Sequence, residues 1–225
     1  HDSSASLAPY FAAGRGRFLL VSTGTWCINM NPFNPEILTT EQLDRDCLCY
    51  MSITRQPVKS SRLFLGHLHD LAAGMLSSHF KTAADFYKSV KPDSGLIRYC
   101  RERFKGNRFF FDNHPYSREL KATLDFYEFR SFAQCSHQLM IELSALAAEA
   151  VDLIIPEDDD IENIYITGGF SVNPLFTKLI SESYPDKNVY TSDIKNATAL
   201  GAALVILPSL DPARKLVPDL GLSRC

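Results

Sequence analysis

A strand pattern that runs directly into two glycines constrains this chain most. Residues 164–167 read Ile-Tyr-Ile-Thr, Gly168 and Gly169 follow, and Asn173-Pro174 opens a stretch with helical spacing. Glycine lets the backbone approach a ligand closely, and proline is favoured in the first helical turn. The start of a helix offers unpaired N–H groups, and Asn173 can cap it or donate to a ligand. The pattern predicts a strand–turn–helix unit that either binds a nucleotide or is a plain connection.

Strand-like and helix-like segments alternate along the whole chain, which predicts an α/β domain. Residues 31–57 are expected to be loop with short strands, residues 91–117 irregular, and residues 156–160 a solvated acidic connector. The remaining predicted strands cover residues 18–22, 26–30, 58–65, 161–167 and 189–190. The predicted helices cover residues 3–13, 66–80, 174–184 and 197–207. A long helical stretch is also predicted from residue 118 to residue 155, with a break near Tyr127.

The overall composition excludes several classes of protein. The 225 residues are 45% hydrophobic and 22% charged, and the net charge is -3. This balance is that of an ordinary globular domain and gives no basic field for nucleic acid or anionic lipid. No apolar run reaches the roughly 18 residues of a membrane span. The six cysteines lack metal-ligand spacing, which predicts reduced thiols in a cytoplasmic protein.

The predicted turn at Thr23-Gly24-Thr25 is a second candidate site. A hairpin tip with Gly24 between two hydroxyl side chains can wrap phosphate oxygens with backbone N–H groups and a threonine O–H. A plain turn is the alternative. Asp2 is a third candidate, because a carboxylate at a helix start can take a proton from a substrate hydroxyl. The alternative for Asp2 is a helix cap.

An H-x-H-D cluster of His67, His69 and Asp70 has residue types that bind metal ions. Positions two apart on a helix point in different directions, and the segment reads as the start of a helix. We therefore expect no metal-binding residues in this chain.

Four motifs in a fixed order resemble the FGGY carbohydrate kinases. In that family a Gly-x-Asp or His-Asp motif opens the second domain, and a Ser-Gly-Thr or Thr-Gly-Thr hairpin follows. Thr-Gly-Gly-x-x-x-Asn-Pro and Ala-Thr-x-Leu-Gly-Ala-Ala then lie near the end. The matching segments are His1-Asp2, Thr23-Gly24-Thr25, residues 167–174 and residues 197–203. Their order and spacing match over nearly the whole chain.

The resemblance implies an actin-like ATPase (RNase H-like) fold, with a mixed sheet flanked by helices. Residues 1–225 would be the ATP-binding C-terminal domain. The sugar-binding N-terminal domain of the same kinase would be absent, so the chain would not be a complete enzyme. The opening residues, His1-Asp2 and not Met, fit an excised domain.

The resemblance also implies roles for single residues. Gly24 and Thr25 would contact the phosphates of ATP, which is used with Mg²⁺. Gly168, Gly169 and Asn173 would hold the adenosine end.

Two further roles follow from the same resemblance. Asp2 would be the catalytic base that deprotonates the sugar hydroxyl. Gly201 would let the last helix pack closely beside the nucleotide turn.

The acceptor implied by the resemblance is a ketose such as L-rhamnulose, L-fuculose or a related pentulose or hexulose. Residues 109–115 lack the Gly-Glu-Arg-x-Pro motif of the xylulose and glycerol kinase branches, and Gly24-Thr25-Trp26 is closer to the rhamnulose and fuculose kinase branch. The alternatives are a non-catalytic actin-like nucleotide-binding module and another kinase of the same superfold, such as an amino-sugar kinase. Asp2 argues against the first and residues 197–203 against the second. The oligomeric state stays open.

Overall fold

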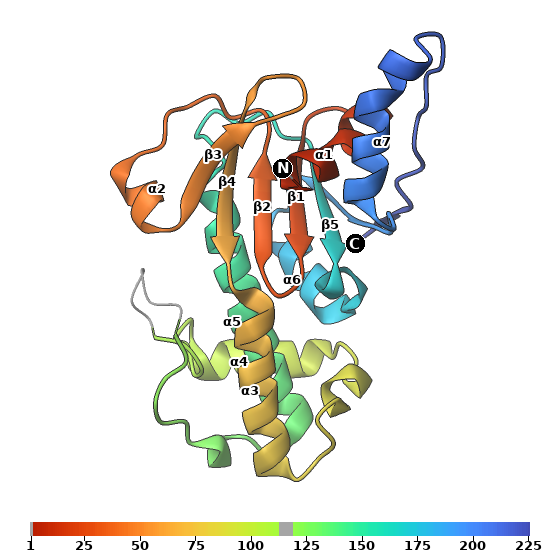
Figure 1. The fold of residues 1–225 in the computed structure, drawn as a ribbon. Helices are drawn as coiled ribbons and strands as arrows, with labels where there is room; N and C mark the ends of the chain where they lie inside the picture. The colour runs from red at the N-terminus through yellow and green to blue at the C-terminus, as the bar shows by residue number, and fades with distance from the viewer. Residues whose placement is uncertain (1, 113–118) are drawn as a thin grey trace.

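The strands of this protein form one mixed sheet in a computed structural model that describes residues 2–112 and 119–225 (Figure 1). The strand order is β3-β4-β2-β1-β5-β6-β7. β5 pairs in parallel with both β1 and β6, and the other neighbours are antiparallel. The strands are Phe18–Thr23 (β1), Cys27–Asn31 (β2), Cys47–Met51 (β3), Pro57–Leu63 (β4), Asn163–Gly168 (β5), Asn188–Ser192 (β6) and Leu222–Arg224 (β7).

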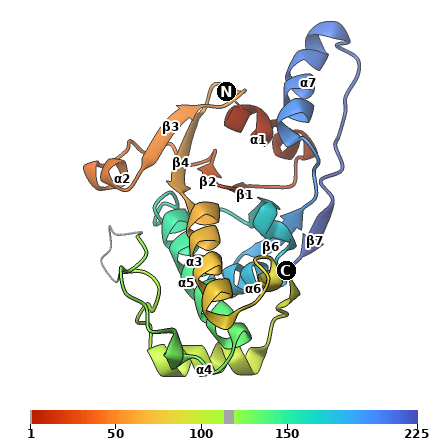
Figure 2. The same cartoon turned by 60° about the horizontal axis from the view of Figure 1, so that its bottom comes forward.

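Helices cover both faces of the sheet. Figure 2 shows α1 and α7 on one side, and α3, α5 and α6 on the other. α3 continues from the end of β4 and packs against α5, which also contacts α4 and α6. The helices are Asp2–Ala13 (α1), Thr40–Asp44 (α2), Leu65–Phe80 (α3), Ser94–Phe104 (α4), Phe132–Asp152 (α5), Pro174–Ser183 (α6) and Ala197–Leu210 (α7), with 3₁₀ turns at Phe86–Ser89, Phe126–Glu128 and Gly169–Val172. Of the helices in the described ranges, none has the length and apolar character of a membrane span.

The central strand β1 is buried on both faces. Leu19 and Val21 belong to the core under α3, α5 and α6, whereas Phe18 and Leu20 belong to the core under α1. Successive side chains of a strand point to opposite faces, so a strand covered on both sides needs apolar residues at every position. This explains the continuous apolar run in the sequence.

Two helices lie where the sequence predicted irregular structure or loop. α4 lies inside residues 91–117, and Asp93 caps it by accepting hydrogen bonds from the N–H groups of Gly95 and Leu96. Pro92 precedes the helix and Gly95 lies in its first turn, and neither residue interrupts the hydrogen bonds of the helix there. α2 begins with a capping box formed by Thr39 and Gln42.

The long helical stretch is shorter than predicted. α5 begins at Phe132, where Ser131 caps it, and a single 3₁₀ turn precedes it at Phe126–Glu128. Residues 119–125 are not helical. Residues 113–118, which include part of the segment that separates the kinase branches, lie outside the described residues.

The packing predicted for Gly201 is wrong. Gly201 is the buried residue of α7 and faces α1: a Cβ placed on it would lie 1.7 Å from the carbonyl oxygen of Ala5. The absence of a side chain therefore lets α7 touch the backbone of α1. The close approach joins the two helices on one face of the sheet and does not involve the glycine turn.

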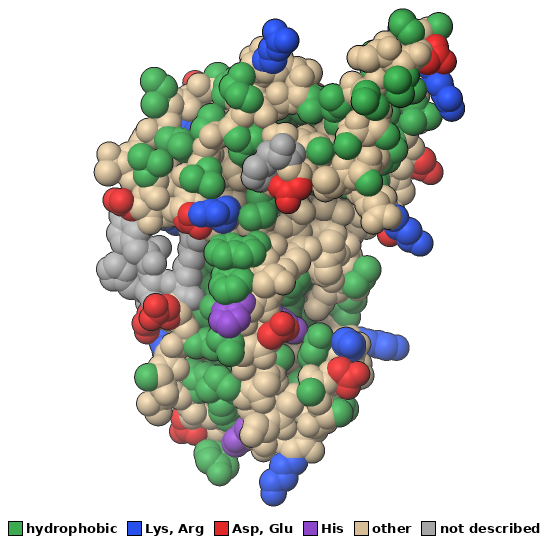
Figure 3. Space-filling view, viewed as in Figure 1, with side chains coloured by type: hydrophobic (Ala, Val, Ile, Leu, Met, Phe, Trp, Pro, Cys, Tyr) green, Lys and Arg blue, Asp and Glu red, His purple; other side chains and the backbone are tan. Residues whose placement is uncertain are grey.

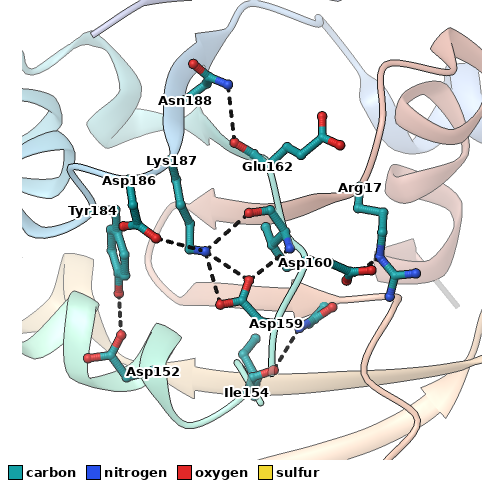
Figure 4. Close-up of polar contacts among 12 residues, drawn as sticks. Arg17, Asp152, Ile154, Asp159, Asp160, Glu162, Tyr184, Asp186, Lys187 and Asn188 are labelled. Carbon is teal, nitrogen blue, oxygen red and sulfur yellow. Dashed lines mark hydrogen bonds and ion pairs between the residues drawn. The ribbon is translucent and has the colours of Figure 1, made fainter. Parts of the chain in front are cut away.

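The acidic connector is only partly solvated, which corrects the sequence-based expectation. Figure 4 shows Asp159 held by Lys187, whose Nζ lies 2.9 and 3.1 Å from the two carboxylate oxygens. The same ammonium group donates to the carbonyl of Ile161, and Arg17 pairs with Asp160 at 2.6 Å. These contacts hold the connector against the start of β5.

Candidate functional site

The predicted hairpin and the predicted glycine turn lie side by side. β1 and β5 are parallel neighbours, and their last residues, Thr23 and Gly168, are directly paired. Parallel strands end at the same edge of a sheet, which is where α/β proteins place ligands. Thr23-Gly24-Thr25 and the turn after β5 therefore meet at the lower edge of the sheet in Figure 1.

Position 168 requires a glycine because the backbone there contacts the hairpin directly. Its φ is +88°, a region that other residues rarely adopt, and a Cβ would lie 1.7 Å from the carbonyl oxygen of Thr23. The hydroxyl of Thr23 donates to the carbonyl of Thr167 at 2.6 Å and accepts from the N–H of Phe170 at 3.0 Å. The two turns are thus locked together by backbone contact and by one buried side chain.

The start of α3 presses against the other side of the hairpin. A Cβ on Gly66 would lie 2.4 Å from the carbonyl oxygen of Gly24, and the Gly66 N–H donates to the carbonyl of Thr25 at 3.0 Å. Sequence reasoning missed Gly66. The available signal was a glycine directly after a predicted strand, where it has a packing reason.

Asn173 caps α6. Its Oδ1 accepts from the N–H groups of Leu175 at 3.0 Å and Phe176 at 3.1 Å, and Pro174 occupies the first turn. Of the two roles considered for this side chain, the cap is observed. The amide also carries two N–H donors on Nδ2, which are the groups available to a ligand.

A hollow of about 540 Å³ lies between these elements. Gly24, Thr25, Gly169 and Asn173 all line it, so the structure brings together four of the six predicted site residues, with Gly168 directly behind them. The other lining residues come from α3, from the 3₁₀ turn after it and from the segment around Asn173: Gly66, His69, Asp70, Tyr87, Lys88, Val90, Phe170, Val172 and Pro174.

One wall of this hollow is aromatic and was not predicted. The buried His69 ring contacts Tyr87 edge-on at 4.6 Å between centroids and Phe170 edge-on at 5.5 Å. Its Nδ1 lies 3.1 Å from a carboxylate oxygen of Asp70, which also lines the hollow. The wall therefore offers flat apolar surface with one carboxylate at its edge, a combination suited to a small organic ligand.

The two histidines of the H-x-H-D cluster lie on α3 and point in different directions, as their helical spacing predicts. His69 points into the wall just described, whereas the exposed His67 stacks on Phe64 at 4.4 Å. In residues 2–112 and 119–225, no three His, Cys, Asp or Glu side chains are grouped so that they could hold a metal ion.

Asp2 is not brought to the hollow. It is exposed at the start of α1, where one carboxylate oxygen accepts from the N–H of Ser3 at 2.8 Å. Two residues on, Ser4 donates to the carbonyl of Met51, which pairs with Pro57 at the start of β4. The hairpin lies beside the other end of β4, so α1 begins away from it.

Comparisons with known proteins agree with this architecture. Residues 15–91 match the family model described as "Carbohydrate kinase FGGY, C-terminal domain". A carbohydrate kinase from Novosphingobium aromaticivorans is 22% identical with a TM-score of 0.67, over 100% of this chain and 45% of that one. A ligand-bound xylulose kinase from Lactobacillus acidophilus is 11% identical with a TM-score of 0.67, over 98% and 44%. Glycerol kinase with ADP from Plasmodium falciparum is 13% identical with a TM-score of 0.59, over 95% and 42%.

The predicted resemblance to FGGY carbohydrate kinases and the predicted actin-like, RNase H-like α/β fold are confirmed. At these identities the likeness to solved structures shows the fold. The chain spans less than half the length of the kinases to which it is similar. A comparison with curated protein sequences gives no match.

Proposed function

We propose that this chain is the nucleotide-binding half of an ATP-dependent sugar kinase. The observation that carries the proposal is the locked pair of turns. Thr23-Gly24-Thr25 and the segment from Gly168 to Asn173 enclose one hollow, and glycine stands where backbones approach most closely. Backbone N–H groups in such turns bind anionic groups without any basic side chain.

The nucleotide would lie along this hollow with its phosphates at the hairpin. Thr25 supplies a backbone N–H group and one hydroxyl there, and Gly24, which has no side chain, lets the phosphates approach the backbone closely. Gly169 leaves open space, because a Cβ on it would meet nothing within 4 Å. The Nδ2 group of Asn173 would donate to the adenosine end, and Tyr87 would border the base.

The reaction would be phosphoryl transfer to a sugar hydroxyl. The hydroxyl oxygen forms a bond to the γ-phosphorus, the bond from that phosphorus to the bridging oxygen of ADP breaks, and the hydroxyl proton passes to a base. We assign the base role to Asp2, which requires the start of α1 to come nearer the hairpin than it lies here. Enzymes of this kind gain most of their catalysis from positioning and charge stabilisation.

Mg²⁺ would accompany ATP and neutralise charge on the transferred phosphoryl group. Mg²⁺ typically keeps several waters and binds through one or two carboxylates plus substrate phosphates. Asp70 is the carboxylate that lines the hollow, so this chain would supply few of the Mg²⁺ ligands.

The acceptor in this proposal is a ketose, and L-rhamnulose, L-fuculose and xylulose are the first sugars to test. The partner would be an N-terminal domain of the same kinase, and the location would be the cytoplasm. The fold likeness to carbohydrate kinases about twice as long supports a missing sugar-binding half.

Calorimetric titration with ADP and a coupled assay for ADP release test the proposal. We expect residues 1–225 to bind ADP with one site and to phosphorylate no ketose, and the full-length protein to turn over at least one of the three. Absence of ADP binding by both proteins would refute it.

The non-catalytic nucleotide-binding module is the second candidate, because the structure places Asp2 away from the hollow. ADP binding by the full-length protein, with no turnover of any ketose, would favour this candidate.

A further inference from the structure

The helix α7 is apolar along its whole length and is left largely uncovered. Its described residues, Ala197 to Leu210, carry no charged side chain, and Gly201 is the one residue among them that is buried. A helix that is hydrophobic on every side is normally buried. We propose that the exposed side of α7 is the surface on which the sugar-binding half of the kinase docks. The inference rests on the proposed function for what that half binds, whereas the contact itself can be tested without turnover.

Large apolar side chains are exposed on α7 and on the segment that follows it. Ile206 is 54% exposed and Leu210 is 73% exposed. Leu216 and Val217 are also exposed, on the segment that runs back beside α7 toward β7 (Figures 1 and 2). We call these four residues the α7 patch, and Figure 3 shows hydrophobic side chains gathered over this helix, with charged ones at its tip. Single exposed apolar residues are common on proteins, whereas a group of them marks an interaction site.

The helical part of the patch faces away from the domain that carries it. Ile206 and Leu210 are four positions apart, so they lie on one face of the helix. Gly201, which touches α1, lies five positions before Ile206 and therefore roughly 140° around the helix from it. α7 packs chiefly against α1, and its far end projects beyond the rest of the molecule in Figures 1 and 2. The exposed face is therefore open to a further body of protein.

The chemistry of α7 favours a protein over a lipid bilayer as the partner. Its 14 residues rise about 21 Å, which is shorter than the roughly 30 Å of a hydrocarbon core. A helix that lies on a bilayer surface carries Lys and Arg on a polar face, and residues 197–210 include neither. Apolar side chains without a basic face are typical of a helix that is covered by other protein.

The occupant that we assign is the other half of the same polypeptide. The chain covers 45% and 44% of two kinases that share its fold, so a kinase of that size has a second body of similar length. A domain on the same polypeptide is present at a high effective concentration, and it covers a neighbouring apolar face before a second copy of the protein does.

The position of α7 also agrees with that of the proposed base. The backbone of Gly201 touches the backbone of Ala5. Ala5 lies three positions after Asp2, which is less than one turn of α1 and about 4.5 Å along its axis. A domain that delivers a sugar hydroxyl to Asp2 therefore lies next to α7, and the α7 patch gives it an apolar surface to bind.

Photo-cross-linking of the full-length protein tests the contact directly. Benzoylphenylalanine is placed at position 206 in one variant and at position 37 in the matched control. Ile37 is also an exposed isoleucine, 91% exposed, but it precedes α2, which packs on the strand β3 at the opposite edge of the sheet from β7. We expect position 206 to cross-link, within one polypeptide, to a peptide outside residues 1–225. Position 37 should give no such product.

A charge in the patch gives an independent readout in the full-length protein. Ile206→Asp places a carboxylate in the contact, so the melting temperature should fall by about 4–8 °C. Ile37→Asp should leave it unchanged. ADP affinity should be the same in both variants, because no described residue of α7 lines the nucleotide hollow.

The outcomes separate this inference from the kinase proposal. An intramolecular cross-link in a protein that phosphorylates no ketose would support the docking surface and refute the kinase. A cross-linked product of doubled mass would overturn the inference and assign the α7 patch to a contact between two copies. The inference also fails if position 206 gives no cross-link to the other half and Ile206→Asp melts at the wild-type temperature.

Discussion

Gly168 and the carbonyl oxygen of Thr23 are so close that a Cβ on the glycine would lie 1.7 Å from that oxygen. The contact joins the end of β5 to the end of β1, and the Thr23 hydroxyl then ties the hairpin to the N–H of Phe170. Gly169, the next residue, has nothing within 4 Å of its Cβ position. Adjacent glycines therefore serve different purposes, one for packing and one for open space.

Gly168→Ala should reduce stability. The added methyl group would overlap backbone atoms of Thr23, which cannot move away as a flexible side chain could, and the φ of +88° is strained for alanine. We therefore expect the free energy of unfolding to fall by about 2–4 kcal/mol. Urea denaturation of both proteins measures the difference. A loss below about 0.5 kcal/mol would show that the two turns can separate without cost.

Two variants of Asn173 separate the role of its Oδ1, which caps α6, from the role of its Nδ2 donors. Asn173→Ala removes both, and we expect a stability loss of about 1 kcal/mol together with weaker ADP binding. Asn173→Asp keeps the oxygen that caps α6 and loses the Nδ2 donors, so stability should be kept while ADP binding falls. Thermal melts and ADP titrations of both variants provide the comparison. Full ADP affinity in Asn173→Asp would remove this side chain from the site.

Asp2→Asn in the full-length protein tests the base. Asparagine keeps the shape and the capping oxygen but does not accept a proton at neutral pH, so kcat at saturating ketose and ATP should fall about 100-fold or more. The melting temperature and ADP affinity should not change. A fall of less than about tenfold would make Asp2 a helix cap and not the base.

Glu142 is a buried carboxylate that sequence reasoning did not single out. It accepts from the backbone N–H groups of Phe109, Phe110 and Phe111 and from the side chain of Gln138. Glu142→Ala should cost about 3 kcal/mol or more, because it leaves buried donors without partners. Glu142→Gln, which keeps one acceptor oxygen, should cost less. Equal stability of wild type and Glu142→Ala in urea would contradict this.

The same carboxylate predicts a pH dependence. Burial raises the pKa of Glu142 above its ordinary value, against the opposite effect of its hydrogen bonds. The folded protein therefore holds this proton to a higher pH than the unfolded chain does, and the associated stability is lost as pH rises through the folded-state pKa. Relative to Glu142→Gln, the wild type should lose stability as the pH rises from the ordinary carboxyl range toward neutrality.

The parts of the site that sequence could predict are those that depend on backbone geometry. Gly24, Gly168 and Gly169 lie in turns directly after apolar strands, and such a turn can be predicted from the neighbouring residues alone. Gly66 was missed because its need for a bare backbone comes from the hairpin, which is distant in the sequence. Asp93 was the overlooked cap of α4, since a proline before it and a glycine after it are also typical of irregular segments.

The placement of α1 could not be predicted from local pattern. Its helix was predicted correctly, but where it begins is set by packing against α7 through Gly201 and by the bond from Ser4 to Met51. These contacts join residues far apart in the sequence. The position of Asp2 relative to the hairpin therefore had to come from the structure.

The central claim is that the hollow beside the hairpin binds the nucleotide, and calorimetric titration of Gly169→Val with ADP tests it most directly. The valine side chain enters space that is open in the structure, so the variant should fold with little change in melting temperature. The account predicts that wild type binds ADP at one site and that Gly169→Val binds at least tenfold more weakly, a difference of about 1.4 kcal/mol. Equal ADP affinity in a folded Gly169→Val variant would contradict the claim.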